Sequence, residues 1–274
     1  MRTSALPLLA LLLTGMASSG RAHEPGEAHY LANEAVVVRH GERAVMFDAL
    51  FVDGLGTYLV PDAATRRAMD EARQQFEYVG AAFVSHIHAD HFDARRTLAF
   101  MRARPEVRIF GPAALSEHLL DAGASPTELE RVRAFEPEAT TSPARVALDD
   151  LTIDVVEVPH SGPERFPGLQ HLVFRVTLDD LTIAHLGDAE VDARHFTRHE
   201  TLWNERATDV AFLPYWFFMS DEGREILQRH LNAHRKIGVH VPANAGRNPA
   251  GFRARLGGDA FVTPGETRVL KHEH

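Results

Sequence analysis

The chain has 274 residues, of which 45% are hydrophobic and 24% charged, and this is the composition of an ordinary globular protein. It excludes a disordered chain, a collagen-like repeat and a protein with many membrane spans. The 38 acidic and 29 basic side chains leave a net charge of −9, which argues against a protein built to bind nucleic acid. The absence of cysteine excludes disulfides, thiolate nucleophiles and thiolate metal ligands.

Residues 1–22 have the features of a signal peptide. Arg2 precedes a short apolar stretch, and small residues follow it at the positions that a signal peptidase inspects. The apolar stretch is shorter than the roughly 20 residues that a membrane-spanning helix needs. We therefore expect a mature chain that begins at His23, folds as one domain over residues 23–274, keeps no stable membrane insertion after cleavage, and is periplasmic or secreted.

Predicted strands and helices then follow one another along the chain. Strands are expected at residues 35–38, 44–47, 81–85, 107–110, 151–158, 172–178, 181–186, 210–213 and 236–241. Helices are expected at residues 94–101, 112–120 and 222–234, and another should begin at the capping box of residues 125–128. Several neighbouring strands are predicted to form hairpins, whereas helices separate others. This mixture predicts an α/β domain built from layers with mixed sheets.

The most informative motif directly follows the predicted strand at residues 81–85. Four potential metal ligands, His86, His88, Asp90 and His91, fall within six residues. Alternation along an extended chain places the first two on one side, where both can meet one ion. The other two lie where the chain turns toward a helix and can face a second ion. Imidazole and carboxylate suit zinc and related divalent ions, so the motif predicts a metal site.

Three further candidate ligands lie at the ends of later predicted strands. His160 follows the strand at 151–158, Asp188 follows the strand at 181–186, and His240 lies in the strand at 236–241. A carboxylate can bridge two cations through its two oxygens. The glycine before Asp188 permits close approach of the backbone.

In these motifs the chain resembles the metallo-β-lactamase superfamily of metal-dependent hydrolases. The matching pieces are HIHADH, the later histidine of VPHSG, the aspartate of HLGDA and the last histidine of IGVHVP, in the order that the superfamily has them. The resemblance covers residues 29–270. It implies a four-layer αββα sandwich with two mixed β-sheets and with metal ions at one edge between the sheets. Ser85 stands where threonine is common, and the cysteine ligand of some β-lactamase branches is absent.

The same resemblance implies two divalent metal ions, zinc in the first instance. His86, His88 and His160 would bind one ion, and Asp90, His91 and His240 the other, with Asp188 as the bridge. The implied reaction is hydrolysis of a small-molecule substrate by a metal-bridged hydroxide, with Asp90 and Asp188 as the catalytic carboxylates. The ester, lactone, lactam and phosphoester classes remain open, as do the metal identity and the oligomeric state.

Two other functions are compatible with parts of the sequence. An exported zinc-binding protein could keep the seven ligands without turnover. A nuclease of the same superfamily is disfavoured by the negative charge, the predicted export and the lack of room for a large inserted domain. Nucleic acid is therefore not an expected partner.

The remaining candidates are given structural or supporting roles. His185 is expected to pack or to support a ligand, and Asp48 to stabilise a loop near the site. Tyr215 and Trp216 follow a strand end close to the expected metals and could form a wall of the substrate pocket. The histidines expected to lie on the solvated surface are His195, His199, His230 and His234.

Overall fold

The structure is a computed structural model that describes residues 25–136, 143–148 and 151–272. The expected signal peptide at residues 1–22 and the expected start at His23 lie outside the described residues. Two sheets of seven strands each form the centre of the molecule. In spatial order, the first sheet consists of β14 (Thr267–Leu270), β1 (Gly26–Ala32), β2 (Ala35–His40), β3 (Arg43–Phe47), β4 (Val79–Phe83), β5 (Arg108–Pro112) and β6 (Val132–Phe135).

The second sheet has the same number of strands and also mixes pairings. Its spatial order is β13 (Asp259–Ala260), β12 (Ala233–Val239), β11 (Thr208–Pro214), β10 (Leu181–His185), β9 (Leu172–Leu178), β8 (Leu151–Glu157) and β7 (Ala144–Leu148). Strands β3 to β6 are parallel in the first sheet, and β10 to β13 are parallel in the second. The other neighbouring pairs are antiparallel.

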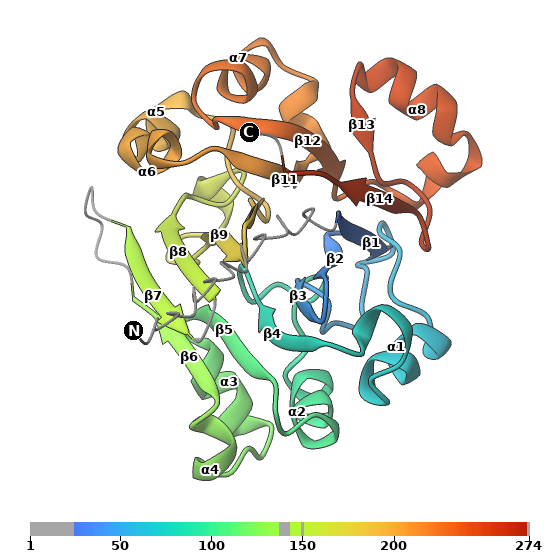
Figure 1. Ribbon diagram of the computed structural model, residues 1–274, viewed down its shortest axis with the longest axis vertical. Helices are drawn as coiled ribbons and strands as arrows, with labels where there is room; N and C mark the ends of the chain where they lie inside the picture. Colours follow the sequence, from blue (N-terminus) through green and yellow to red (C-terminus); the bar gives the residue numbers. More distant parts are fainter. Residues whose placement is uncertain (1–24, 137–142, 149–150, 273–274) are drawn as a thin grey trace, which may run out of the picture.

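Helices cover the outer face of each sheet, as Figure 1 shows. The first sheet carries α1 (Ala63–Asp70), α2 (Ala94–Ala103), α3 (Leu115–Asp121) and α4 (Pro126–Leu129), and the second carries α5 (Ala193–Thr197), α6 (Glu200–Glu205) and α7 (Asp221–Arg229). Helix α8 (Pro249–Leu256) lies beside β13. Short 3-10 helices are η1 (Gln74–Phe76), η2 (Pro163–Arg165), η3 (Tyr215–Phe218) and η4 (Ala243–Arg247). The predicted αββα sandwich with two mixed sheets is therefore confirmed.

Alternation along the strands explains the four layers. On β2, Val36 and Val38 point into the core between the sheets, whereas Val37 packs under the helices of the first sheet. On β11, Phe212 faces the same central core, and Leu213 faces α5, α6 and α7. Because side chains alternate between the faces of a strand, each sheet is apolar on both sides and must be covered on both.

Two predicted helices have different bounds in the structure. Residues 112–120 were expected to be helical, but Pro112 pairs with Phe135 as the last residue of β5, so α3 begins only at Leu115. The helix expected at 222–234 ends at Arg229, because Asn232 has a φ of 42° and Ala233 already pairs with β11. The capping box at residues 125–128 is confirmed, with both of its reciprocal hydrogen bonds present at the start of α4.

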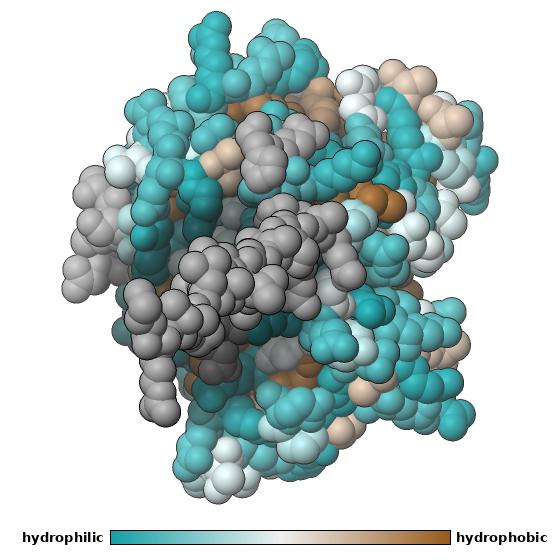
Figure 2. All heavy atoms as spheres, viewed as in Figure 1, coloured by the Kyte–Doolittle hydropathy of each residue, from teal (hydrophilic) through white to brown (hydrophobic). Residues whose placement is uncertain are grey.

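The described helices are too short and too polar to cross a bilayer. The face of the molecule shown in Figure 2 is mostly hydrophilic, with small hydrophobic patches among the polar side chains. This surface agrees with the composition read from the sequence.

Candidate metal centre

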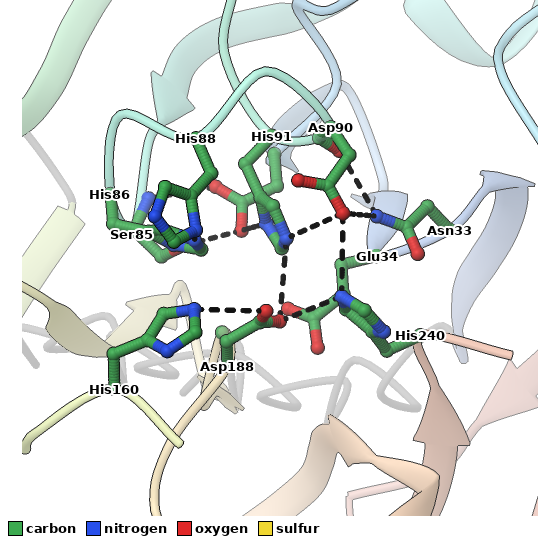
Figure 3. Close-up of polar contacts among 12 residues, drawn as sticks. Asn33, Glu34, Ser85, His86, His88, Asp90, His91, His160, Asp188 and His240 are labelled. Atoms are coloured by element: carbon green, nitrogen blue, oxygen red, sulfur yellow. Dashed lines mark hydrogen bonds and ion pairs between the residues drawn. The ribbon is translucent and has the colours of Figure 1, made fainter. Parts of the chain in front are cut away.

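Four strand ends bring the predicted ligands together. The turn from Ser85 to His91 follows β4 of the first sheet, whereas the segments that carry His160, Asp188 and His240 follow β8, β10 and β12 of the second. Figure 3 shows these side chains converging on one small region from both sheets. All seven predicted ligands therefore meet, although up to 154 positions separate them in the sequence (240 − 86 = 154).

Asp188 lies at the centre of the site, and its two oxygens face different histidines. Oδ1 is 3.0 Å from Nε2 of His240 and 3.3 Å from Nε2 of His91. Oδ2 is 3.2 Å from Nε2 of His160. One carboxylate thus contacts two separate groups of imidazoles.

Two separate groups of candidate ligands lie around this carboxylate, and a third, formed by His86, His91 and Asp188 itself, shares one histidine with each of them. In the first, one nitrogen each of His86, His88 and His160 lies within 4.8 Å of the others. In the second, the same holds for the ligand atoms of Asp90, His91 and His240. This is the partition that the sequence resemblance implied. All of these residues except His88, which is half-buried, are buried.

Two residues from other loops fix the orientation of the ligands. Asp48, directly after β3, accepts hydrogen bonds from the backbone N–H and hydroxyl of Ser85 at 2.7 and 2.6 Å, and its Oδ2 is 2.9 Å from Nδ1 of His91. Asn33 donates from Nδ2 to the backbone carbonyl of Asp90 at 3.0 Å. The bonds to Ser85 stabilise the turn that carries the motif, as predicted for Asp48. The contact with His91 was not predicted, and a carboxylate on Nδ1 turns Nε2 of the same ring toward the site.

Backbone geometry also shapes the site. Gly187 has a φ of +50°, and a Cβ there would lie 2.6 Å from Nε2 of His171 and 2.7 Å from Cβ of Ser85. Glycine is therefore required for close approach before Asp188, as the sequence predicted. His240 also has a positive φ of 58°, and its backbone N–H donates to the carbonyl of Asn33. A histidine in this sparsely populated region indicates a backbone held by its surroundings.

Opposite charges set the protonation of the buried ligands. Burial opposes ionisation of Asp188, yet His240 and His91 hold the pKa of its carboxyl well below its ordinary value. Burial opposes a charged imidazole in both His91 and His240, but the carboxylates outweigh it. Asp188 raises the pKa of His91 well above its ordinary value, and Asp188 together with Asp90 raises the pKa of His240 to about 9. Burial and the nearby His91 instead lower the pKa of His86 well below its ordinary value. The buried carboxylates and imidazoles therefore set one another's pKa values through their opposite charges.

The donor set fits divalent cations. Buried atoms that form no hydrogen bond within the described residues include Nε2 of His91, His160 and His240 and Oδ1 of Asp188. Buried polar atoms without partners are costly, and these face one another across the centre of the site. Imidazole nitrogens with carboxylate oxygens are the ligands that zinc and similar ions prefer. The residues present therefore fit metal ions.

Sequence reasoning missed three residues near the ligands. Glu34 is fully buried, and burial together with the nearby Asp188 raises the pKa of its carboxyl well above its ordinary value. His171 is buried with its ring 5.2 Å from that of His86, and the ring of Tyr58 is 4.1 Å from that of His240. All three lie in turns or loops, where no periodic pattern indicates which way a side chain points.

The predictions for the supporting residues have mixed outcomes. His185 is buried and packs between Phe47, whose ring it stacks on, and the carbonyl of Glu34, as expected for a packing residue. Trp216 lies with its ring 5.0 Å from that of His240, and Tyr215 packs against Trp216. The role of these two aromatic residues in a substrate pocket stays a prediction.

One of the histidines expected at the surface is buried. His199 lies at the junction of α5 and α6, which pack on the second sheet, so the prediction of a solvated side chain was wrong. His195 is half-buried with Nε2 3.1 Å from Oε2 of Glu190. His230 is half-buried, and His234 is exposed but lies on β12 rather than on a helix.

The family described as the beta-lactamase superfamily domain matches residues 43–247, which is more than half of the chain. The chain therefore belongs to this family, and the metallo-β-lactamase resemblance read from the motifs is confirmed. No curated protein matches the chain.

Solved structures share the fold at low sequence identity. Igni18, a metallo hydrolase from Ignicoccus hospitalis, has 17% identity and a TM-score of 0.60, covering 91% of this chain and 100% of its own. A possible metal-dependent hydrolase from Veillonella parvula has 16% identity and a TM-score of 0.58, covering 91% and 100%. Zn(2+)-bound PqqB from Methylobacterium extorquens has 13% identity and a TM-score of 0.51, covering 85% and 86%. At these identities the likeness establishes the fold.

Proposed function

We propose that this chain is an exported metal-dependent hydrolase with a dinuclear site that acts on a small-molecule substrate. The observation that carries the proposal is the position of Asp188, whose two carboxylate oxygens face the two ligand groups separately. Igni18, one of the proteins with a similar fold, is a metallo hydrolase, and PqqB, another, binds Zn(2+), which supports zinc as the first metal to test. Export is proposed from the sequence of residues 1–22 alone.

Each ligand group has a defined part in this proposal. His86, His88 and His160 would hold one ion, and Asp90, His91 and His240 the other, with Asp188 shared between them. Two divalent ions bound in this way would supply Lewis acidity and generate a nucleophile from water at neutral pH.

The chain's own side chains would orient and support this chemistry. Asp48 accepts from Nδ1 of His91 and so keeps Nε2 of that ring directed at the site. The ring of Tyr58 is 4.1 Å from that of His240. Burial, with Asp188 and Asp90 nearby, raises the pKa of the Tyr58 hydroxyl. It therefore remains protonated, and we assign it the role of donating a hydrogen bond to the oxygen of a bound substrate.

The proposal is tested with a purified, zinc-loaded chain and a panel of esters, lactones, β-lactams and phosphodiesters. At least one class should be hydrolysed, and Asp188→Ala should lower kcat/KM by more than about hundredfold, because both ligand groups lose a shared carboxylate. Asp221→Ala is the matched control, since its fully exposed side chain lies on α7, and it should keep the wild-type rate.

Two results would contradict the proposal. Retention of zinc with no turnover of any class would favour the zinc-binding alternative. Wild-type turnover by a folded Asp188→Ala chain would show that the reaction does not depend on the shared carboxylate.

A further inference from the structure

A cavity of about 450 Å³ opens next to one of the ligands. His160 forms part of its wall, so anything bound in the cavity lies beside the first ligand group. Most of the other side chains in its lining are apolar, among them Pro159, Pro163, Phe166 and Leu169, and the polar Gln170 also contributes. The cavity thus offers an apolar surface next to the atoms proposed to carry the chemistry.

Phe166 connects the cavity to the metal ligands. Its ring is 4.7 Å from the ring of His88 and 4.7 Å from that of His160, in an edge-on arrangement with both. The backbone holds it there, because its N–H donates to the carbonyl of Pro163 and its own carbonyl accepts from Leu169. Phe166 is therefore a fixed wall between the ligand group and the cavity.

One acidic side chain contributes to the lining of this cavity. Among the described residues that line it, the one ionisable side chain besides the ligand His160 is Glu157. Arg165 lies close in sequence but is exposed, folds back over Gly162 and is 3.8 Å from Glu164. Enzymes that act on phosphoryl groups commonly place arginine or lysine against them, and the described residues of this lining include neither.

A second cavity of about 440 Å³ has a more polar set of side chains in its lining. It lies beyond Tyr58, whose backbone bridges to Pro242, and its lining includes Thr57, Asn244 and Arg247. The two cavities therefore differ in their side chains: those beside His160 are mainly apolar, whereas those beside Pro242 include the polar Thr57, Asn244 and Arg247.

We infer that the substrate is an uncharged carboxylic ester whose apolar acyl chain occupies the cavity beside Phe166. This inference rests on the proposed hydrolase function and adds a substrate class to it. The reaction needs only water as co-substrate. The water oxygen forms a new bond to the carbonyl carbon, the ester C–O bond breaks, the alcohol leaves with one proton, and the acid releases the other.

The test compares 4-nitrophenyl esters of acetate, butyrate and hexanoate, with bis-4-nitrophenyl phosphate as the phosphodiester. For the wild-type chain, kcat/KM should rise with chain length, by up to about fourfold for each methylene that becomes fully buried. Phe166→Ala should flatten this dependence on length. Leu120→Ala, which truncates an exposed apolar side chain on α3, should leave it unchanged.

Glu157 provides a second, independent readout. The monoester of glutarate with 4-nitrophenol carries a carboxylate where the hexanoate ester has the end of its chain, and it should be the poorer substrate. Glu157→Gln should narrow the difference between these two esters, because it removes the like charge from the cavity. This change in selectivity does not depend on whether Phe166→Ala folds, and Phe166→Leu supplies a milder variant of the ring.

The possible failures are distinguishable. Faster hydrolysis of the phosphodiester than of the hexanoate ester, or the same dependence on length in Phe166→Ala, would overturn this inference and leave the proposed hydrolase standing. No hydrolysis of any ester, lactone, β-lactam or phosphodiester would overturn the proposed function itself.

Discussion

Gly187 illustrates how much a single residue decides in this site. The sequence already placed a glycine before Asp188 and predicted close backbone approach. In the structure, the atoms closest to a Cβ at this position would be Nε2 of His171 and the side chain of Ser85. Sequence alone could not supply them, because His171 and Ser85 lie on segments 16 and 102 positions away from Gly187 (187 − 171 = 16; 187 − 85 = 102).

Replacing Gly187 should lower the stability of the fold by more than the strain of its positive φ alone. Gly187→Ala should lower the free energy of unfolding by about 2–3 kcal/mol, because a Cβ would collide with buried atoms as well as strain the positive φ. Gly41→Ala is the matched control, with a φ of +58° and open space around the added atom, and should cost about 1 kcal/mol. Urea denaturation measures both, and equal losses would contradict the assigned contacts.

At the scale of elements, the strands that lead into the candidate ligands were predicted from the sequence, whereas several strands at the edges of the sheets were not. The strands that became β4, β8, β10 and β12 show apolar or alternating patterns, and each leads into a predicted ligand. Five strands were not predicted: β1, β6, β7, β13 and β14. The edge strands β7 and β14 are short, and most of their residues are exposed or half-buried. Their identity depends on partners that lie far away in the sequence.

Asp259 on β13 links strands of both sheets and gives the fold a dependence on acid. Its carboxylate is 2.9 Å from Arg235 of β12 and 2.8 Å from Arg268 of β14. Burial opposes its charge, yet Arg268 and Arg235 lower the pKa of Asp259 below the ordinary value of 3.8. A carboxyl with a lowered pKa stabilises the fold above its ordinary pKa, and this contribution is lost as the pH falls through the lowered value.

Asp259→Asn should therefore be less stable than the wild type at pH 7, by about 1 kcal/mol because the group is partly exposed. The difference in the free energy of unfolding should shrink as the pH falls below 3.8. Thermal unfolding of both chains across this range is the measurement. A difference that stays constant with pH would show that the ion pairs do not stabilise the fold.

On the scale of the whole molecule, the candidate metal centre lies between the two sheets. The motif after β4 contributes the candidate ligands His86, His88, Asp90 and His91 from the first sheet, and the other three candidates come from the second. An ion bound by both would hold the sheets together at this edge, in addition to the apolar core between them. The order of the motifs indicated which candidate ligands meet. The positions of Glu34 and Tyr58 beside them could be found only from the three-dimensional structure.

Removal of metal should therefore destabilise the entire domain. A cation present at 1,000 times its dissociation constant stabilises the folded chain by about 4 kcal/mol. For a domain of this size, a loss of that order lowers Tm by roughly 10 °C. Calorimetry before and after chelation measures the shift, and restoring zinc should reverse it. An unchanged Tm after complete removal of metal would show that binding is not coupled to folding.

The most direct test of the account is the metal content of the purified, folded chain, measured by elemental analysis after zinc loading. The wild type should hold about two divalent ions per chain, one for each of the two ligand groups beside Asp188. His160→Ala should hold about one, because it loses a ligand from the first group alone. A folded wild-type chain without stoichiometric metal, or a ratio that His160→Ala leaves unchanged, would contradict it.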